Sequence, residues 1–223
     1  VVYKLLNLVK FTDGAIIVDS TVMNKTGKKM ELVSYIKSSK DKAPVLGYEI
    51  LVICYHMYSC FFPICFKIKS SKSVPDEEWY NKETLKNSNG SLRRKDVKKQ
   101  TKLDMMLEMI KYLQDKKLKF KKVIFDSWFA FPSIINQIKK EMNLDVICRI
   151  KLSDKIYQFV YKDKVYTVKN LYKHFARKHF KYISSMGISC CRLSVKMIWY
   201  GEVTLVFSRD FHEIYDKNKA DFV

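Results

Sequence analysis

Two aspartates in this chain each follow a run of apolar residues that is typical of a buried strand. Asp19 closes the run AIIVD at 15–19, and Asp126 closes the run KKVIFD at 121–126. If the two strands lie side by side, both carboxylates project from the same edge of one sheet. Carboxylate oxygens are the ligands that Mg²⁺ prefers, and a pair of such ions activates a water or hydroxyl against a phosphodiester. A third acid normally completes a site of this kind.

Each aspartate also has an ordinary structural interpretation. Asp19 could end its strand in a turn, where Asp is common. Asp126 could cap a helix, although Pro132 favours a helix that starts several residues later. The neighbouring Trp128 and Phe129 are expected in the core rather than stacked on bases.

The charge balance points to a polyanionic partner. The chain has 223 residues, of which 48% are hydrophobic, so it can bury a core. Its 42 Lys and Arg residues against 23 Asp and Glu residues give a net charge of +19. Nucleic acid is the leading candidate, because basic side chains release counterions when they neutralise phosphates. An anionic membrane surface is the second candidate, and a very soluble protein of a Lys-rich proteome is the third.

Basic residues gather at three places along the chain. Two lysines follow Gly27, a basic run occupies 93–102 within a polar, flexible connection at 70–101, and a basic amphipathic helix is expected at 168–183. The candidate DNA-binding residues are Lys28, Lys29, Arg93, Arg94, Lys95, Lys98, Lys99, Lys173, Arg177, Lys178 and Lys181. The helix also carries His174 and His179, whose spacing does not place them on one helix face, so we expect no zinc site there.

The cysteines and the apolar segments indicate a cytoplasmic protein. Six cysteines occur without a CxxC pair, and no signal peptide is visible. The apolar stretch at 45–68 is long enough to cross a bilayer, but Glu49, His56 and Pro63 interrupt it, so we predict two buried strands at 45–55 and 60–68 joined by a tight turn. The chain starts with Val, which suggests a fragment or an interrupted reading frame.

Periodicity predicts a mixed order of elements. Three strands come first and can form an antiparallel meander, followed by helix, strand, helix, strand and then a β-rich addition. The predicted elements after the first three strands are a helix at 103–114, the strand ending at Asp126, a helix from Pro132, a strand at 144–151, a hairpin at 155–168 about Lys162–Asp163, the basic helix, and strands at 189–199 and 202–208.

Four segments in this order resemble the catalytic domain of bacterial insertion-sequence DDE transposases. The segments are IIVDSTVMNKTGKKMELVS, RRKDVKKQTKLDMMLEMIKYL, KKVIFDSWFAFPSIINQIKK and LDVICRIK. The resemblance covers roughly residues 14–208, and FDSWF followed by a helix is its most specific part. It implies an α/β, RNase H-like mixed sheet flanked by helices, with a β-rich insertion after the fifth core strand. The domains expected are the first part of the core at 1–151, the insertion at 152–208, and the start of the last catalytic helix at 209–223.

The resemblance also implies which residues form the site. The first and second metal-binding acids of the family fall on Asp19 and Asp126. The third is a Glu in a motif of Tyr, Arg, Glu and Lys; with Tyr215 on the motif's Tyr, Asn218 falls on the Arg and Phe222 on the Glu. We therefore expect the third acid to be missing, or to lie in a part not present here, and the chain alone to be inactive or very weak.

The activity implied is DNA cleavage and strand transfer with Mg²⁺ or Mn²⁺ at the inverted-repeat ends of the protein's own element. Such a protein acts in the bacterial cytoplasm at the nucleoid, as a homodimer in a synaptic complex, and not at a membrane. A non-catalytic basic nucleic-acid-binding protein is the alternative, and a peripheral membrane protein is a third.

Overall fold

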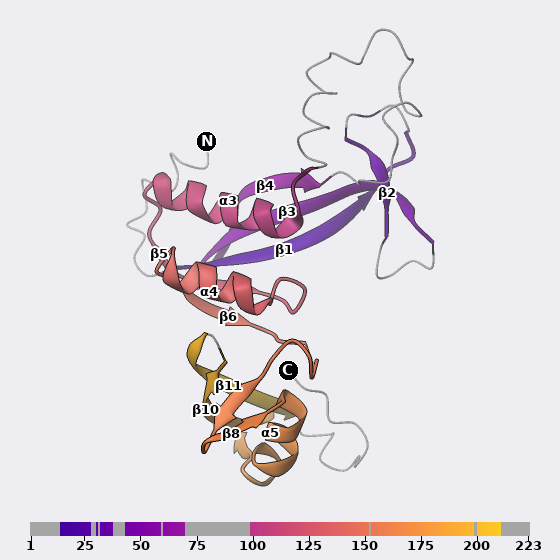
Figure 1. Cartoon of the computed structure of the whole chain (residues 1–223). Coiled ribbons are helices and arrows are strands. Elements are labelled where there is room, and N and C mark those ends of the chain that lie inside the picture. The colour runs from indigo at the N-terminus through magenta and orange to yellow at the C-terminus, as the bar shows by residue number, and fades with distance from the viewer. Residues whose placement is uncertain are drawn as a thin grey trace. The chain divides into compact units, whose positions relative to one another are not determined.

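The computed structural model describes residues 14–27, 30, 32–37, 43–58, 60–69, 99–151, 153–198 and 200–210 (Figure 1). The chain divides into two compact units, and each is described by itself. Unit 1 comprises residues 1–125 and 138–147, and unit 2 comprises 126–137 and 148–223.

Unit 1 is built on a mixed six-stranded sheet. Its strands are β1 (Gly14–Asn24), β2 (Ser34–Ile36), β3 (Val45–Met57), β4 (Cys60–Lys69), β5 (Phe120–Phe125) and β6 (Asp145–Cys148). Antiparallel β3 separates β1 from β4 and also pairs with the short β2. On the other side of β1, β5 is parallel and β6 lies beyond it. The mixed α/β sheet confirms the predicted RNase H-like fold class.

One face of this sheet forms the core of unit 1. Ile16 and Val18 of β1 are fully buried, and so are their partners on β3, Tyr55 and Ile53. Helix α3 (Lys102–Asp115) packs on β3 and β4 (Figure 1). It contributes the buried side chains Met105, Met106, Met109, Ile110 and Leu113.

Local signals explain where α3 begins. The Thr101 side chain accepts a hydrogen bond from the backbone N–H of Asp104, and the Asp104 carboxylate accepts one from the N–H of Thr101. This reciprocal cap satisfies two N–H groups that have no partner within the helix. Two lysines then tie the helix to the sheet: Lys102 pairs with Glu49 on β3, and Lys67 on β4 pairs with Glu108.

Unit 2 holds a five-stranded sheet against a short helix. Its elements are β7 (Phe159–Tyr161), β8 (Lys164–Tyr166), α5 (Val168–His174), the 3₁₀ turn η1 (Ala176–Lys178), β9 (Lys181–Ile183), β10 (Ile188–Met197) and β11 (Gly201–Asp210). Tyr157, Phe159, Leu171, Val195 and Phe207 are among its buried core residues. Helix α4 (Pro132–Lys140) starts at the predicted proline and crosses the boundary between the units.

Several predicted elements are confirmed. Helix α3 and strands β10 and β11 have nearly the predicted limits, and the hairpin of β7 and β8 forms about the predicted turn with shorter strands. Lys162 and Asp163 have φ of 49° and 59°, as a two-residue hairpin turn requires. The segment 45–68 forms two strands, and no helix in the described ranges is long and apolar enough to cross a membrane.

Three predictions about elements are wrong. Strand β1 does not end at Asp19 but runs on to Asn24, because β3 continues to pair with it as far as Gly47. Strand β4 is not buried, since it is an edge strand that leaves Phe61 and Phe66 exposed. The basic helix ends at His174 rather than near 183, because the buried Ala176 starts a tighter turn and Lys181 lies in β9.

The structure adds β2, which no pattern in the sequence indicated, and shortens the strand predicted at 144–151 to β6. Most of the predicted connection at 70–101 lies outside the described residues, as do residues 211–223, where the third acid was sought.

Candidate functional site

Asp19 lies in the middle of β1, where antiparallel pairing with β3 holds its backbone. Its residue partner on β3 is Val52, and the preceding residue, Val18, is paired with Ile53 on β3 and Phe125 on β5. The Asp19 side chain is exposed, and one carboxylate oxygen, Oδ1, accepts a hydrogen bond of 2.7 Å from the N–H of Ser20. A central strand therefore presents this carboxylate to solvent on the face opposite the core.

A cysteine that sequence reasoning missed lies close to this carboxylate. Cys54 of β3 is paired with Ile17, two residues before Asp19, and so shares its face of the sheet. Burial raises the pKa of the Cys54 thiol, and the negative charge of Asp19 raises it further. The Asp19 carboxylate therefore interacts electrostatically with the Cys54 thiol. No pattern in the sequence marks Cys54, because only the strand register brings it there.

Asp126 occupies the first position after β5, where a loop begins. Its Oδ1 accepts a hydrogen bond of 2.9 Å from the N–H of Trp128, and its backbone carbonyl accepts one of 3.3 Å from the N–H of Phe129. The side chain is exposed. Asp126 therefore holds a turn, but it does not cap α4, which begins at Pro132.

The loop after Asp126 is anchored within unit 2. Phe129 is 1% exposed, as predicted for a core residue, whereas Trp128 is 40% exposed and packs edge-on against it. The N–H of Phe131 donates to the carbonyl of Phe129. The hydroxyl of the buried Tyr157 donates to the carbonyl of Ala130. Burial also raises the pKa of Tyr157 to about 12, so the hydroxyl keeps its proton.

The donor set suits a hard divalent cation but is small. Each aspartate uses one oxygen for a backbone N–H, and neither carboxylate has an ion pair or a further hydrogen bond among the described residues. Both carboxylates therefore keep an oxygen for a metal ion. Within those same ranges, no group of three or more His, Cys, Asp and Glu side chains is placed to hold a metal ion.

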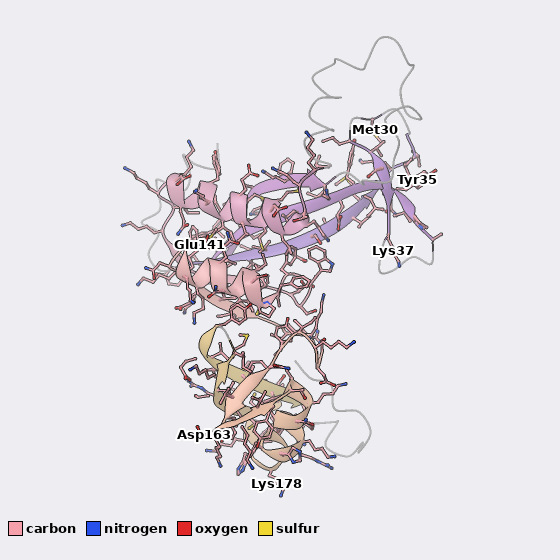
Figure 2. All side chains as sticks on the ribbon, viewed as in Figure 1. Met30, Tyr35, Lys37, Glu141, Asp163 and Lys178 are labelled. Carbon is pink, nitrogen blue, oxygen red and sulfur yellow. The ribbon has the colours of Figure 1, made fainter. Side chains whose placement is uncertain are left out.

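The predicted basic residues fall into two groups. Lys99, Lys173, Arg177, Lys178 and Lys181 are described and exposed. Figure 2 labels Lys178, whose side chain extends from η1 into solvent. The other candidates, Lys28, Lys29, Arg93, Arg94, Lys95 and Lys98, lie outside the described residues. The predicted basic residues of unit 2 come from α5, η1 and β9 rather than from one helix.

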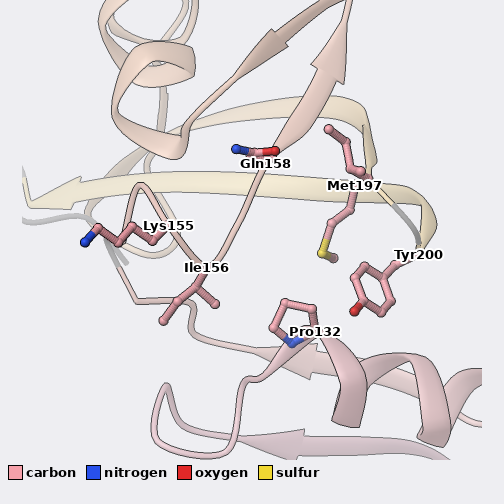
Figure 3. Close-up of a pocket in the computed structure, with 7 residues that line it drawn as sticks. Pro132, Lys155, Ile156, Gln158, Met197 and Tyr200 are labelled. Carbon is pink, nitrogen blue, oxygen red and sulfur yellow. The ribbon is translucent and has the colours of Figure 1, made fainter.

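A pocket of about 200 Å³ lies within unit 2 (Figure 3). It is lined by Pro132, Lys155, Ile156, Gln158, Met197, Ile198 and Tyr200. No lining residue carries a carboxylate, so this pocket is not a site for a hard metal ion.

Most of the chain matches the model of one protein family. The model described as DDE superfamily endonuclease matches residues 3–168, well over half of the chain. This chain belongs to the DDE superfamily endonucleases. The match includes Asp19, Asp126 and all of β1 to β8. No curated protein and no solved structure matches the chain.

Membership of this family of DDE endonucleases gives the chain a transposase-like nuclease function. DNA is the substrate that the family implies, and its members generally use divalent metal ions. The exposed carboxylates of Asp19 and Asp126 are of the chemical type that such ions require.

Proposed function

We propose that this DDE endonuclease is the catalytic part of an insertion-sequence transposase, which cleaves DNA and transfers strands at the inverted-repeat ends of its own element. In this proposal Asp19 and Asp126 bind Mg²⁺ or Mn²⁺ together. Residues 152–208 are the β-rich insertion of the catalytic core. The protein acts at the nucleoid in the cytoplasm, as a homodimer in a synaptic complex.

The strand register is the observation that carries the proposal. Val18 and Phe125 are partners on the parallel strands β1 and β5, and Asp19 and Asp126 are the next residue of each segment. Side chains alternate between the two faces of a sheet, and Val18 and Phe125 are both buried. The residue that follows each one is expected on the opposite face of the sheet, away from the core.

The chain's own groups orient the two carboxylates. The N–H of Ser20 holds Oδ1 of Asp19, and the N–H of Trp128 holds Oδ1 of Asp126, which leaves Oδ2 of each aspartate for metal. Ions bound there supply a Lewis acid and a polarised water for attack on a phosphodiester. The proposed phosphate contacts, which position DNA without reading its sequence, are Lys28, Lys29, Arg93, Arg94, Lys95, Lys98, Lys99, Lys173, Arg177, Lys178 and Lys181.

Mn²⁺ binding to residues 1–223 tests the site independently of turnover. Asp19→Asn and Asp126→Asn should each weaken Mn²⁺ binding by about a hundredfold, because even the partners of metal ligands contribute ten- to a hundredfold. Asp145→Asn is the matched control, since Asp145 is an exposed aspartate at the start of β6. Binding that survives both substitutions would refute the shared site.

A double-variant cycle tests whether the two aspartates share their ions. If they do, Asp19→Asn combined with Asp126→Asn should cost far less than the sum of the single losses. Additive losses would mean two separate sites. DNA affinity in low salt without metal should stay the same in all of these variants, because phosphate binding depends on the basic residues.

Catalysis itself is expected to be absent or very weak in residues 1–223. The family's third acid finds no match in the sequence of 212–223, where Phe222 falls on the Glu position. Phosphoryl transfer depends mainly on positioning, so the loss of one ligand is severe. A strand-transfer assay on a DNA end with Mg²⁺ measures this, and robust activity would contradict it.

The net charge of +19 favours a second candidate, a basic DNA-binding protein without catalysis. The Mn²⁺ titration separates the two candidates. A non-catalytic binder would hold DNA at low salt but would show no metal site that depends on Asp19 and Asp126.

A further inference from the structure

The unit 1 sheet presents two chemically different faces. Lys67 and Glu49 point toward α3, where they form ion pairs of 2.6 and 2.5 Å with Glu108 and Lys102. The residue paired with Lys67 on β3 and the residue paired with Glu49 on β4 therefore lie on the same face, which α3 covers. Residues one step away along each strand lie on the opposite face, which we call the open face.

The register arranges the open face in rows that run across the strands. One row joins Asp19 on β1, Val52 on β3 and Phe66 on β4. Neighbouring strands are spaced by about 4.8 Å, so Phe66 lies about 10 Å from Asp19 along the row.

A second row lies at the other end of the same strands. It joins Lys122 on β5, Ala15 on β1, His56 on β3 and Phe61 on β4. Between the two rows, Ile17, Cys54 and Pro63 form a third.

Two phenylalanines on the open face are unusually exposed. Phe61 is 60% and Phe66 is 66% exposed, and the ring of Phe61 contacts the ring of His56 with centroids 4.6 Å apart. Exposed aromatic groups of this kind indicate a surface that a partner covers. Aromatic rings at the outer strand and the Asp19 carboxylate at the central strand thus belong to one continuous surface.

Charge decides which partner fits this surface. A second copy of the chain would bring another +19 charges, so repulsion opposes direct contact of two copies at this face, unlike a dimer assembled on DNA. DNA is the substrate of the family, and unpaired nucleobases present flat apolar faces that stack on aromatic rings whatever their sequence. Lys122, exposed at the β5 end of its row, adds a cation for the backbone phosphates.

We infer that the open face is a stacking platform for unpaired bases next to the phosphodiester that Asp19 serves. Phe61 and Phe66 support the bases, and the substrate is a DNA end whose strands are separated rather than a fully paired duplex. The inference rests on the proposed function, because it takes Asp19 to mark the place of the scissile phosphate.

Binding measurements without metal test the platform. Fluorescence anisotropy compares a blunt duplex with the same duplex carrying a single-stranded extension of about six nucleotides, within the usual site size for such surfaces. Phe61→Ala and Phe66→Ala should each weaken binding of the extended DNA about fivefold or more, and together about 25-fold, with blunt-duplex affinity unchanged. A fluorescent base analogue in the extension should be quenched by the wild type and not by the double variant.

Phe62→Ala is the matched control. Phe62 is 40% exposed and lies on the same strand, but it is paired with Tyr55 and so faces the α3 side. Its loss should not change binding of either DNA. Equal losses on both DNAs, or an effect of Phe62→Ala as large as that of Phe66→Ala, would overturn the inference.

Thermal unfolding distinguishes the remaining explanation, that protein rather than DNA covers the open face. In that case Phe61→Ala and Phe66→Ala would lower the unfolding temperature and leave the preference for extended DNA intact, which also overturns the inference. The Mn²⁺ titration stays independent of this result. A platform that fails while metal binding by Asp19 persists refutes the platform alone.

Discussion

Tyr157→Phe should loosen the loop that carries Asp126. In the wild type the Tyr157 hydroxyl donates to the carbonyl of Ala130, four residues after Asp126, and both Tyr157 and Ala130 are 1% exposed. The substitution keeps the ring that packs on Phe159 and removes only the donor. The buried carbonyl then loses its partner without gaining water.

The cost follows from that burial. An unsatisfied buried acceptor costs about 1–3 kcal/mol, and in a protein of this size each kcal/mol lowers the unfolding temperature by about 2–4 °C. Differential scanning calorimetry should therefore show a fall of about 2–12 °C for Tyr157→Phe. Tyr166→Phe is the control, because the Tyr166 ring packs on Phe175 while its hydroxyl has no hydrogen-bond partner among the described residues.

The burial of the Tyr157 hydroxyl gives a pH signature. Burial raises the pKa of Tyr157 from 10.0 to about 12, so the folded state favours the protonated hydroxyl. This contribution to stability is complete below pH 10 and is lost as the pH rises toward about 12. Urea titrations across that range should show an alkaline loss in the wild type that is smaller in Tyr157→Phe.

Metal binding completes the test. A loop that is less firmly held should weaken Mn²⁺ binding by about tenfold, as the loss of a supporting contact does at metal sites. Tyr157→Phe that unfolds at the wild-type temperature and binds Mn²⁺ normally would refute the view that this bond positions Asp126.

Three further substitutions test the packing of unit 1. Thr101→Ala removes the reciprocal cap of α3 and should cost about 1 kcal/mol, measured by urea unfolding. Gly14→Ala would place a Cβ 2.1 Å from the Tyr55 hydroxyl oxygen, which donates to the carbonyl of Lys119, so the unfolding temperature should fall clearly. Burial raises the pKa of the Cys65 thiol from 9.0 to about 11, so the folded state favours the protonated thiol. The stability that this gives is complete below pH 9.0 and is lost as the pH rises toward about 11. Cys65→Ser should remove this alkaline loss of stability.

The sequence predicts best where one signal dominates. The apolar spacing of α3, the strand that leads to Asp126 and the turn at Lys162–Asp163 were all foreseen, because local residues determine them. The limits of β1 were not, because only pairing with β3 carries that strand past Asp19 to Asn24.

Surface residues of strands were also beyond prediction. The run CFFPICFKIK at 60–69 is almost continuously apolar, so its pattern cannot tell which side faces α3. The register with β3 decides it, placing Phe62 on the covered side and Phe61 and Phe66 on the open face. The basic residues after His174 were assigned to one helix because charge does not reveal that Ala176 is buried and starts a new turn.

The two aspartates are held by different means, and this difference bears on how the site works. Asp19 is paired with Val52 on β3 and directly follows the last residue of β1 that pairs with β5, so its backbone is held by the sheet. Asp126 starts a loop whose position depends on hydrogen bonds to Trp128, Phe129 and, through Ala130, to Tyr157. Sites on strands are positioned more firmly than sites on loops. In the proposed metal site we therefore expect Asp19 to be the fixed point and Asp126 to be the ligand whose placement responds to metal and DNA.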